Sequence, residues 1–294
     1  MPHAGALLAG DAPAFANPGF QQTNVWSSRL SRHRPRADSY TPRRSHACQH
    51  RTHSGETAKR YEIYYWTGIQ GRGEFVRLAL EDAGASYVDV AREQGDDAIV
   101  RYLDGVHEGA LPFAPPFLKA GRLLIAQTAN ILQYLGPPLG LVPESESRRL
   151  YAHQLQLTIA DLVAEVHDSH HPIASSLYYE DQRVEARRRA ADLRETRLPK
   201  YLDYFEQVLE RGGGQHALHG HSCVDLSLFQ LISGLEYAYP RTMQRLAHKL
   251  PLLHALTQRV AGRPRLAAYL ASPRRLPFNE SGIFRHYPEL DDPA

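Results

Sequence analysis

The dipeptide Gln127-Thr128 precedes a segment in which Ile131, Leu132 and Leu135 recur with the period of a helix. A threonine at that point offers a hydroxyl and a backbone N–H at a helix N-terminus, where the helix dipole favours a negative charge. The chemistry that this pair could supply is therefore the binding of an anion. The alternative is an ordinary helix cap, which a threonine forms without any ligand.

Tyr65 and Trp66 end an aromatic and β-branched run that begins at Tyr61 and is typical of a strand. Arg72 follows at the start of the next predicted helix. A tyrosine hydroxyl can donate a hydrogen bond to a ligand, and an arginine at this position can add a positive field. The alternatives are a tyrosine packed within the strand and a solvated arginine at the helix start.

Three histidines, His167, His170 and His171, are spaced so that they share one face near the end of a predicted long helix. The only well-spaced carboxylate is that of Asp168, and no cysteine completes a set of metal ligands. We interpret the histidines as a polar cluster at a helix end, with a metal site as the alternative. The glycine run 212–214 lacks the Lys-Ser/Thr pair of a phosphate-binding loop.

The composition is that of a soluble globular protein, with 43% hydrophobic and 22% charged residues among 294. No apolar run approaches the ~20 residues of a membrane-spanning helix, so we expect no membrane partner. Two distant cysteines, Cys48 and Cys223, exclude a disulfide scaffold and fit a reducing compartment such as the cytoplasm. Residues 1–60 carry nine Lys/Arg against three Asp/Glu, and the remainder 25 against 29. The folded part is therefore not expected to attract nucleic acid.

Residues 1–60 are rich in Pro, Ser, Gly, Arg and His and have no helical or strand period. Such a segment buries too little apolar surface to fold, so we expect a disordered basic extension. A wrongly assigned start would also explain it. A transit peptide and a nucleic-acid-binding arm are the alternatives, although the segment lacks the amphipathic period of the former.

Two domains follow from the order of the predicted elements. Residues 61–137 predict the order strand, helix, strand, helix, strand, strand, helix, in which the first strands form a parallel crossover unit. The segments are 61–66, 75–83 with a cap at Gly84, 86–90, 93–105 with an apolar face of Ile99, Val100 and Leu103, 117–118, 123–125 and 127–135. Residues 138–145 are the predicted linker. Residues 146–294 predict helices alone, with 224–235 at the centre and others near 181–210, 241–249, 252–262 and 264–271.

This organisation resembles the cytosolic glutathione transferase family over about residues 61–290. Four stretches carry the resemblance: Tyr64 to Glu74, Pro115 to Phe117, Gln127-Thr128 eleven residues after Pro116, and Ser222 to Leu226. The first is similar to the tyrosine-type classes, with a sigma- or mu-like and bacterial-looking character. The resemblance implies an α/β thioredoxin-like N-terminal domain and an all-α helical bundle.

The resemblance also implies which residues act on glutathione. In the family a tyrosine hydroxyl donates to the glutathione sulfur and favours the thiolate, which matters because a free thiol has a pKa near 8.5. We place this catalytic role on Tyr65, with Arg72 beside it and Trp66 in contact with glutathione. The pair Thr67-Gly68 makes the match one residue longer than usual, which leaves Tyr64 and Trp66 as alternatives.

The remaining glutathione contacts follow in the same way. Pro116 matches the family's cis-proline, and the residue before it binds the cysteinyl part of glutathione through its N–H and C=O. That residue is Pro115, which has no N–H. Gln127 and Thr128 match the pair that binds the γ-glutamyl carboxylate. His107, with Arg101 nearby, is the candidate for the glycyl carboxylate.

The stretch Ser222-Cys223-Val224-Asp225 resembles the family's capping box, in which Asp225 reaches back to the start of its helix. We expect Cys223 to be buried and inert. No cysteine occurs near residues 64–72, which argues against the cysteine-type classes.

The resemblance therefore implies an enzyme that conjugates the glutathione thiolate to an electrophilic small molecule bound in an apolar pocket of the helical domain. It also implies a homodimer, glutathione as the co-substrate and no metal. The alternative is a non-catalytic module of the same fold that carries ligands or docks proteins, since fold does not fix function. Association with nucleic acid through residues 1–58 is a third hypothesis.

Overall fold

The computed structural model of the protein describes residues 60–105 and 109–292. Its sheet has the strand order β2-β1-β3-β4. The strands are β1 (Tyr61–Tyr64), β2 (Tyr87–Asp89), β3 (Phe117–Ala120) and β4 (Leu123–Ala126). β1 runs parallel to β2 and antiparallel to β3, and β3 runs antiparallel to β4. The predicted parallel crossover followed by an antiparallel hairpin is therefore confirmed.

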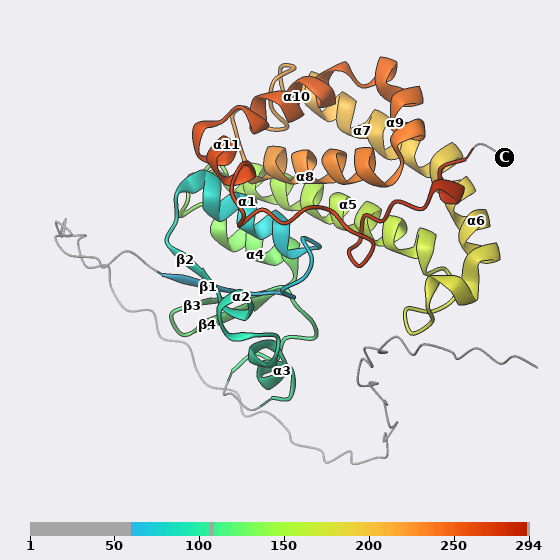
Figure 1. Ribbon diagram of the computed structural model, residues 1–294. Helices are drawn as coiled ribbons and strands as arrows, with labels where there is room; N and C mark the ends of the chain where they lie inside the picture. Colours follow the sequence, from blue (N-terminus) through green and yellow to red (C-terminus); the bar gives the residue numbers. More distant parts are fainter. Residues whose placement is uncertain (1–59, 106–108, 293–294) are drawn as a thin grey trace, which may run out of the picture. The chain divides into compact units, whose positions relative to one another are not determined.

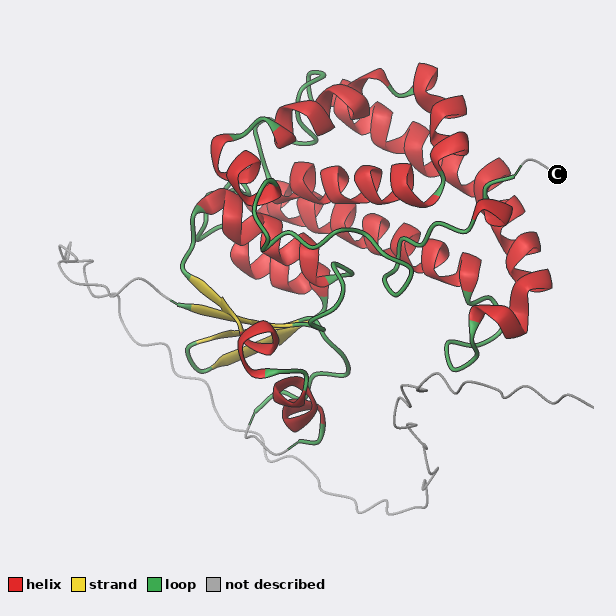
Figure 2. Cartoon of the chain, viewed as in Figure 1, coloured by secondary structure: helices red, strands yellow, loops and turns green. Residues whose placement is uncertain are grey.

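Helices cover both faces of this sheet (Figure 1; Figure 2). On one face lie α1 (Gly73–Ala83) and α4 (Thr128–Leu135), whose apolar residues share a core cluster with the strands. The buried members of this cluster come from β1, α1, β3 and α4, and they are Tyr61, Ile63, Val76, Leu80, Leu118, Ala120, Ile131 and Leu135. On the other face, α2 (Val90–Gln94) and α3 (Asp97–Leu103) pack over strand residues such as Phe117.

The segment over 93–105, predicted as a short helix or an irregular helical segment, contains the end of one short helix, α2, and the whole of another, α3, separated at Gly95. Gly95 has a φ of +85°, which a continuous helix does not contain. The predicted apolar face also differs, because Val100 is 42% exposed while Ala98 and Ile99 are buried. Gly84 ends α1 in the left-handed conformation with a φ of +65°, as predicted.

The rest of the described chain is helical, as predicted. The helices are α5 (Glu146–His170), α6 (Arg183–Asp192), α7 (Leu198–Arg211), α8 (Cys223–Ala238), α9 (Pro240–Leu246), α10 (Pro251–Ala261) and α11 (Pro264–Leu270). The helix predicted over 181–210 is divided by a wider helical turn at Leu193–Arg197. α8 is buried along nearly its whole length and forms the centre of this part.

α1 and α4 also pack against the helical part, where α1 contacts α8 and α11 and α4 contacts α5. The C-terminal segment after α11 runs back across α8 and α5, as Figure 1 shows. Phe284 of this segment lies directly on Gly234 of α8, where any side chain would overlap its ring. Within the described residues, no helix combines the length and the apolar character needed to cross a membrane.

Candidate functional site

Tyr65 lies just after β1, with its ring beneath the first turn of α1. Its side chain is 4% exposed, and its hydroxyl oxygen accepts a hydrogen bond from the backbone N–H of Arg72 at 2.9 Å. Two glycines make this packing possible. A Cβ at Gly71 would overlap the Tyr65 hydroxyl, and one at Gly73 would lie 2.6 Å from Tyr65 Cγ. The motif Gly71-Arg72-Gly73 is therefore shaped around this tyrosine.

The environment of Tyr65 keeps its hydroxyl protonated. Burial raises the pKa of Tyr65, and this effect outweighs the hydrogen bond from Arg72 and the charges of Arg72 and Arg77, which act in the opposite direction. Because the Arg72 N–H occupies a lone pair of the oxygen, the hydroxyl proton of Tyr65 is free to be donated elsewhere. A tyrosine hydroxyl must be protonated in this way if it is to donate a hydrogen bond to an anion.

The loop between Tyr65 and α1 is fastened to the helical part of the chain. Gln70 donates from Nε2 to the carbonyl oxygen of Leu276 at 2.5 Å, and its Oε1 accepts from Nε2 of Gln230 at 2.8 Å. Asn279 Nδ2 donates to the carbonyl oxygen of Gly68 at 2.9 Å. Residues more than 150 positions away in the sequence thus hold this loop in place.

The first turn of α1 carries a buried ionic network. Glu74 and Arg77 are both fully buried, and Glu74 Oε1 accepts from the Tyr269 hydroxyl at 2.6 Å and from Arg275 Nη1 at 2.7 Å. Arg77 Nε donates to Asp89 Oδ2 at 2.7 Å. Sequence reasoning missed this network. The available signal was a Glu and an Arg three residues apart on an amphipathic helix whose other residues up to Leu80 are apolar.

Gln127 and Thr128 lie at the start of α4, as predicted. Gln127 has a φ of +70°, and it is the only residue other than glycine with a positive φ among those described. Such a conformation is costly for a side chain that is not glycine, and strain of this kind is concentrated at functional sites. Thr128 is the first residue of α4, and its Oγ1 is enclosed by protein without any hydrogen-bond partner in the described part.

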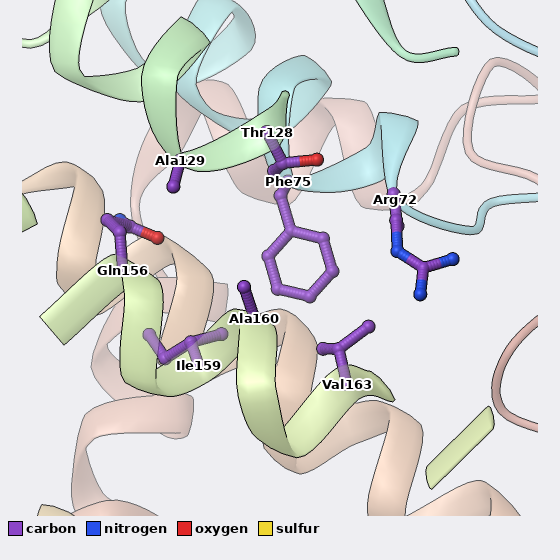
Figure 3. A pocket seen from close by; sticks show the side chains of 8 residues that line it. All are labelled: Arg72, Phe75, Thr128, Ala129, Gln156, Ile159, Ala160 and Val163. Carbon is purple, nitrogen blue, oxygen red and sulfur yellow. The ribbon is translucent and has the colours of Figure 1, made fainter. Parts of the chain in front are cut away.

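Thr128 faces a small pocket between α1, α4 and α5 (Figure 3). The lining residues are Arg72, Phe75, Thr128, Ala129, Gln156, Ile159, Ala160 and Val163. The Phe75 ring projects into the middle of this group, and Arg72 extends along its edge. The cavity holds about 30 Å³. This is far below the ~300 Å³ or more of a typical small-molecule pocket, so it accommodates one end of a ligand rather than a whole tripeptide.

Among the described residues, the other predicted glutathione contacts do not line this pocket. The peptide bond between Pro115 and Pro116 is cis, as predicted. Pro115 is half-buried, and Trp66 is partly buried against the opposite face of the sheet, with the α2–α3 cluster. Arg101 is exposed on α3. His107 lies outside the described residues. The structure thus brings Arg72 and Thr128 into one pocket, with Tyr65 behind Arg72, and directs Trp66 elsewhere.

The predicted capping box at the start of α8 is present. Asp225 is fully buried, and its Oδ2 accepts from the backbone N–H of Ser222 at 2.7 Å and from its Oγ at 2.8 Å. Cys223 beside it is 2% exposed, and burial raises the pKa of its thiol to about 12. The prediction that Cys223 is buried is therefore confirmed, and a thiol of that pKa has almost no thiolate at neutral pH, as an inert cysteine requires.

The three histidines meet at the C-terminal end of α5. The Nδ1 atoms of His170 and His171 lie 2.5 Å apart, and His170 Nε2 lies 2.8 Å from the carbonyl oxygen of Ile283. Burial lowers the pKa of His170 to about 3, despite the hydrogen bond to Ile283. His167 Nδ1 contacts Asp168 at 3.1 Å. The histidines form a packed polar cluster, and the C-terminal segment covers it.

Comparisons with known proteins agree with this architecture. Residues 167–273 match the family model of the glutathione S-transferase C-terminal domain. The glutathione S-transferase of Plasmodium falciparum (isolate 3D7) is 25% identical over 218 residues, which are 71% of this chain and 95% of that protein. Glutathione S-transferase P of Bos taurus is 29% identical over 234 residues, which are 76% and 98% of the two chains.

Two solved structures share the fold. The Pi-class glutathione S-transferase of Onchocerca volvulus aligns with a TM-score of 0.58 at 24% identity, over 76% of this chain and 98% of that one. Prostaglandin synthase D of Nilaparvata lugens aligns with a TM-score of 0.57 at 18% identity, over 74% of this chain and 99% of that one. The thioredoxin-like sheet followed by a helical domain is the arrangement of these structures. All four relatives are eukaryotic and give no support to a bacterial-looking character.

Proposed function

We propose that this relative of the cytosolic glutathione S-transferases binds glutathione and transfers its sulfur to an electrophilic small molecule. The observation that carries the proposal is that the Thr128 hydroxyl has no hydrogen-bond partner among the described residues. This hydroxyl is enclosed at the N-terminus of α4, in a pocket shared with Arg72 and beside the strained Gln127. A carboxylate bound there would accept from Thr128 and meet the positive end of the helix dipole. We assign it to the γ-glutamyl end of glutathione.

Tyr65 supplies the donor that the thiolate needs. Its oxygen already accepts from Arg72, which leaves its proton available for the glutathione sulfur in this proposal. Each unit by which this bond lowers the thiol pKa represents ~1.4 kcal/mol of preferential stabilisation of the anion. The thiolate then forms a carbon–sulfur bond with the electrophile, while any leaving group departs with the displaced electron pair.

The cysteinyl and glycyl parts of glutathione have fewer contacts in this proposal. Pro115 offers a carbonyl oxygen but no N–H, beside the cis-Pro116. His107 is the proposed contact for the glycyl carboxylate, and we expect no metal to take part. Trp66, which packs with the α2–α3 cluster, is left without a glutathione contact. Affinity for glutathione therefore depends mainly on Gln127 and Thr128.

We further propose a cytoplasmic homodimer that acts in detoxification, without a nucleic-acid or membrane partner. α5 supports the dimer, since its Leu150 is 59% exposed and its Leu157 is 49% exposed. Phe113, in the loop before the cis-proline, is 89% exposed. Large apolar side chains exposed to this degree are typical of surfaces that a second subunit covers.

A non-catalytic module of this fold is the second candidate, and specific observations favour it. The pocket at Thr128 holds only about 30 Å³, Pro115 lacks an N–H, and Tyr65 is almost fully covered. A protein of this kind would bind glutathione weakly or not at all, and it would gain nothing from the Tyr65 hydroxyl.

Calorimetric titration with glutathione tests the proposal. We expect micromolar to millimolar binding by the full chain and a loss of about tenfold or more in Thr128→Ala. Thr158→Ala is the matched control, because its Oγ1 bonds only to the Gln154 carbonyl of its own helix, at 3.1 Å. An absence of binding at millimolar glutathione would instead favour the non-catalytic module.

A further inference from the structure

A second pocket lies in the helical part, away from Thr128, and its wall is basic. Its cavity holds about 250 Å³. The polar residues that line it are Gln215, His216, His221, Arg259 and Arg263, and the rest of the wall is aliphatic. These residues come from the loop before α8, from the end of α10 and from the residue before α11. None of them belongs to the proposed glutathione site.

Two of the basic groups are already paired with a buried carboxylate. The side chain of Asp82, from α1, is 2% exposed. Asp82 Oδ2 accepts from His221 Nε2 at 2.8 Å, and Asp82 Oδ1 accepts from Arg263 Nε at 2.5 Å. Burial alone would raise the pKa of Asp82, but the hydrogen bonds from His221 and Arg263 lower it. This carboxylate is thus fully engaged and anchors the pocket wall.

Arg259 has no such partner. Its Nη2 donates to the carbonyl oxygen of Gln215 at 2.5 Å, whereas its Nε is shielded from solvent and has no acceptor. No carboxylate of the described residues lies within ion-pair distance of Arg259. Although Arg259 as a whole is partly exposed, a shielded Nε donor without an acceptor is costly, because a buried polar group is stable only when it is hydrogen-bonded. An anion that reached this atom from the pocket would remove the cost.

A metal cation is the competing occupant, since ligand atoms of His216, His221 and Asp225 lie within 4.8 Å of one another. However, both oxygens of Asp225 are in use. Oδ1 accepts from the Ala217 N–H at 2.9 Å, and Oδ2 holds the capping box of α8. His221 Nε2 is bound to Asp82. A cation would have to break these bonds beside two arginines, so the geometry favours an anion.

We propose that this pocket binds the phosphate group of a small phosphorylated molecule, with Arg259 as the principal ligand and Arg263 and His216 beside it. Arginine suits the role because its planar fork of N–H groups matches the tetrahedral oxygens of phosphate. The volume of about 250 Å³ leaves room beyond a phosphate group for a small organic substituent against the aliphatic wall.

The test is calorimetric titration of the full chain with inorganic phosphate and with ribose 5-phosphate, at ionic strength held constant with chloride. We expect saturable binding of one equivalent, weakened about tenfold or more in Arg259→Gln. Arg245→Gln is the matched control, because Arg245 is exposed on α9 outside the pocket. Tighter binding of the ester than of free phosphate would identify an organic phosphate as the ligand, and equal binding would identify phosphate itself.

Three results would overturn the proposal. They are the absence of saturable binding of either probe, equal affinities in wild type and Arg259→Gln, and preferential binding of Zn²⁺ that His216→Gln removes. Thermal unfolding of each variant confirms that it is folded. Arg259→Lys provides a second variant that keeps the positive charge but loses the planar guanidinium group. Glutathione binding is expected to stay unchanged in Arg259→Gln, so the test is independent of the proposed function.

Discussion

The backbone N–H of Arg72 donates to the hydroxyl oxygen of Tyr65 at 2.9 Å. This bond fixes the direction of the hydroxyl, because it uses a lone pair and leaves the proton for another acceptor. It also links the end of β1 to the first turn of α1, so the tyrosine and the helix start move as one unit. The glycines on either side of Arg72 allow this approach.

Tyr65→Phe is expected to lower kcat/KM for conjugation by roughly 10- to 100-fold, because it removes a hydrogen bond of ~1.5–3 kcal/mol to an anion. The pH at which the rate is half-maximal should rise by one unit or more. Tyr64→Phe is the matched control, since the Tyr64 hydroxyl donates to Glu62 on the opposite face of the sheet. The assignment fails if the Tyr64 variant, and not the Tyr65 variant, moves the pH profile.

Gly73→Ala is expected to destabilise the fold by about 1–3 kcal/mol, because the new methyl group would lie 2.6 Å from Tyr65 Cγ within a packed core. Urea denaturation measures the change in the free energy of unfolding. Gly68→Ala is the control, since a Cβ at Gly68 would meet nothing within 4 Å. Equal stabilities of the two variants would show that the loop does not pack on Tyr65 in this way.

The histidine cluster at the end of α5 is expected to make the fold sensitive to mild acid. The pKa of His170 falls from 6.5 in its ordinary state to about 3 in the folded protein. Between these values the unfolded chain binds a proton that the folded chain does not. The free energy of unfolding should therefore decrease as pH falls below 6.5, by up to ~1.4 kcal/mol per pH unit for this residue.

Denaturation between pH 5 and 6.5 separates the effect of the histidines from that of the carboxyl groups, which ordinarily titrate near pH 4, and comparison with a His170 variant isolates the part due to His170. His170→Gln should flatten the dependence in this range while keeping a donor for the Ile283 carbonyl. His219→Gln, at an exposed position, should leave the slope unchanged. A slope that is the same in wild type and His170→Gln would mean that His170 is charged in the folded protein. His171, whose pKa is lowered to about 4, contributes in the same direction.

Local signals in the sequence predicted much of the fold. Gly84 ended a helix because glycine adopts the left-handed conformation, and Ser222 and Asp225 formed a capping box at their expected spacing. Gln127 and Thr128 began α4 as predicted. These features depend on residues within a few positions of each other, which a single sequence displays directly.

Features that depend on distant partners could not be predicted. Glu74 meets Tyr269 and Arg275 about 200 positions later, and no sequence pattern indicates that these side chains converge. The wider turn at Leu193–Arg197 lies within an unbroken helical period. The division at Gly95 was visible in principle, since a glycine followed by two aspartates favours the end of one helix and the start of another.

The loop that carries Gln70 is expected to depend on the helical part for its order. Gln70→Ala removes the hydrogen bonds to Leu276 and Gln230. It leaves the buried Gln230 amide without its partner, at a cost of about 1–3 kcal/mol, and the half-buried Leu276 carbonyl at a smaller cost. Hydrogen exchange of the Arg72 amide should accelerate, because the loop is then held mainly by Asn279. Gln207→Ala is the control, since that glutamine is exposed on α7.

A double-mutant cycle with Gln230→Ala separates the two bonds of Gln70. Because Gln70 and Gln230 are 5% and 0% exposed, we expect a coupling energy of roughly 0.5–3 kcal/mol in urea denaturation. Additive effects would mean that the bond between them contributes nothing, and the loop would then be held by Leu276 and Asn279. If Gln70→Ala changes the pH dependence of the conjugation rate while Tyr65 is intact, the helical part positions the Tyr65 hydroxyl.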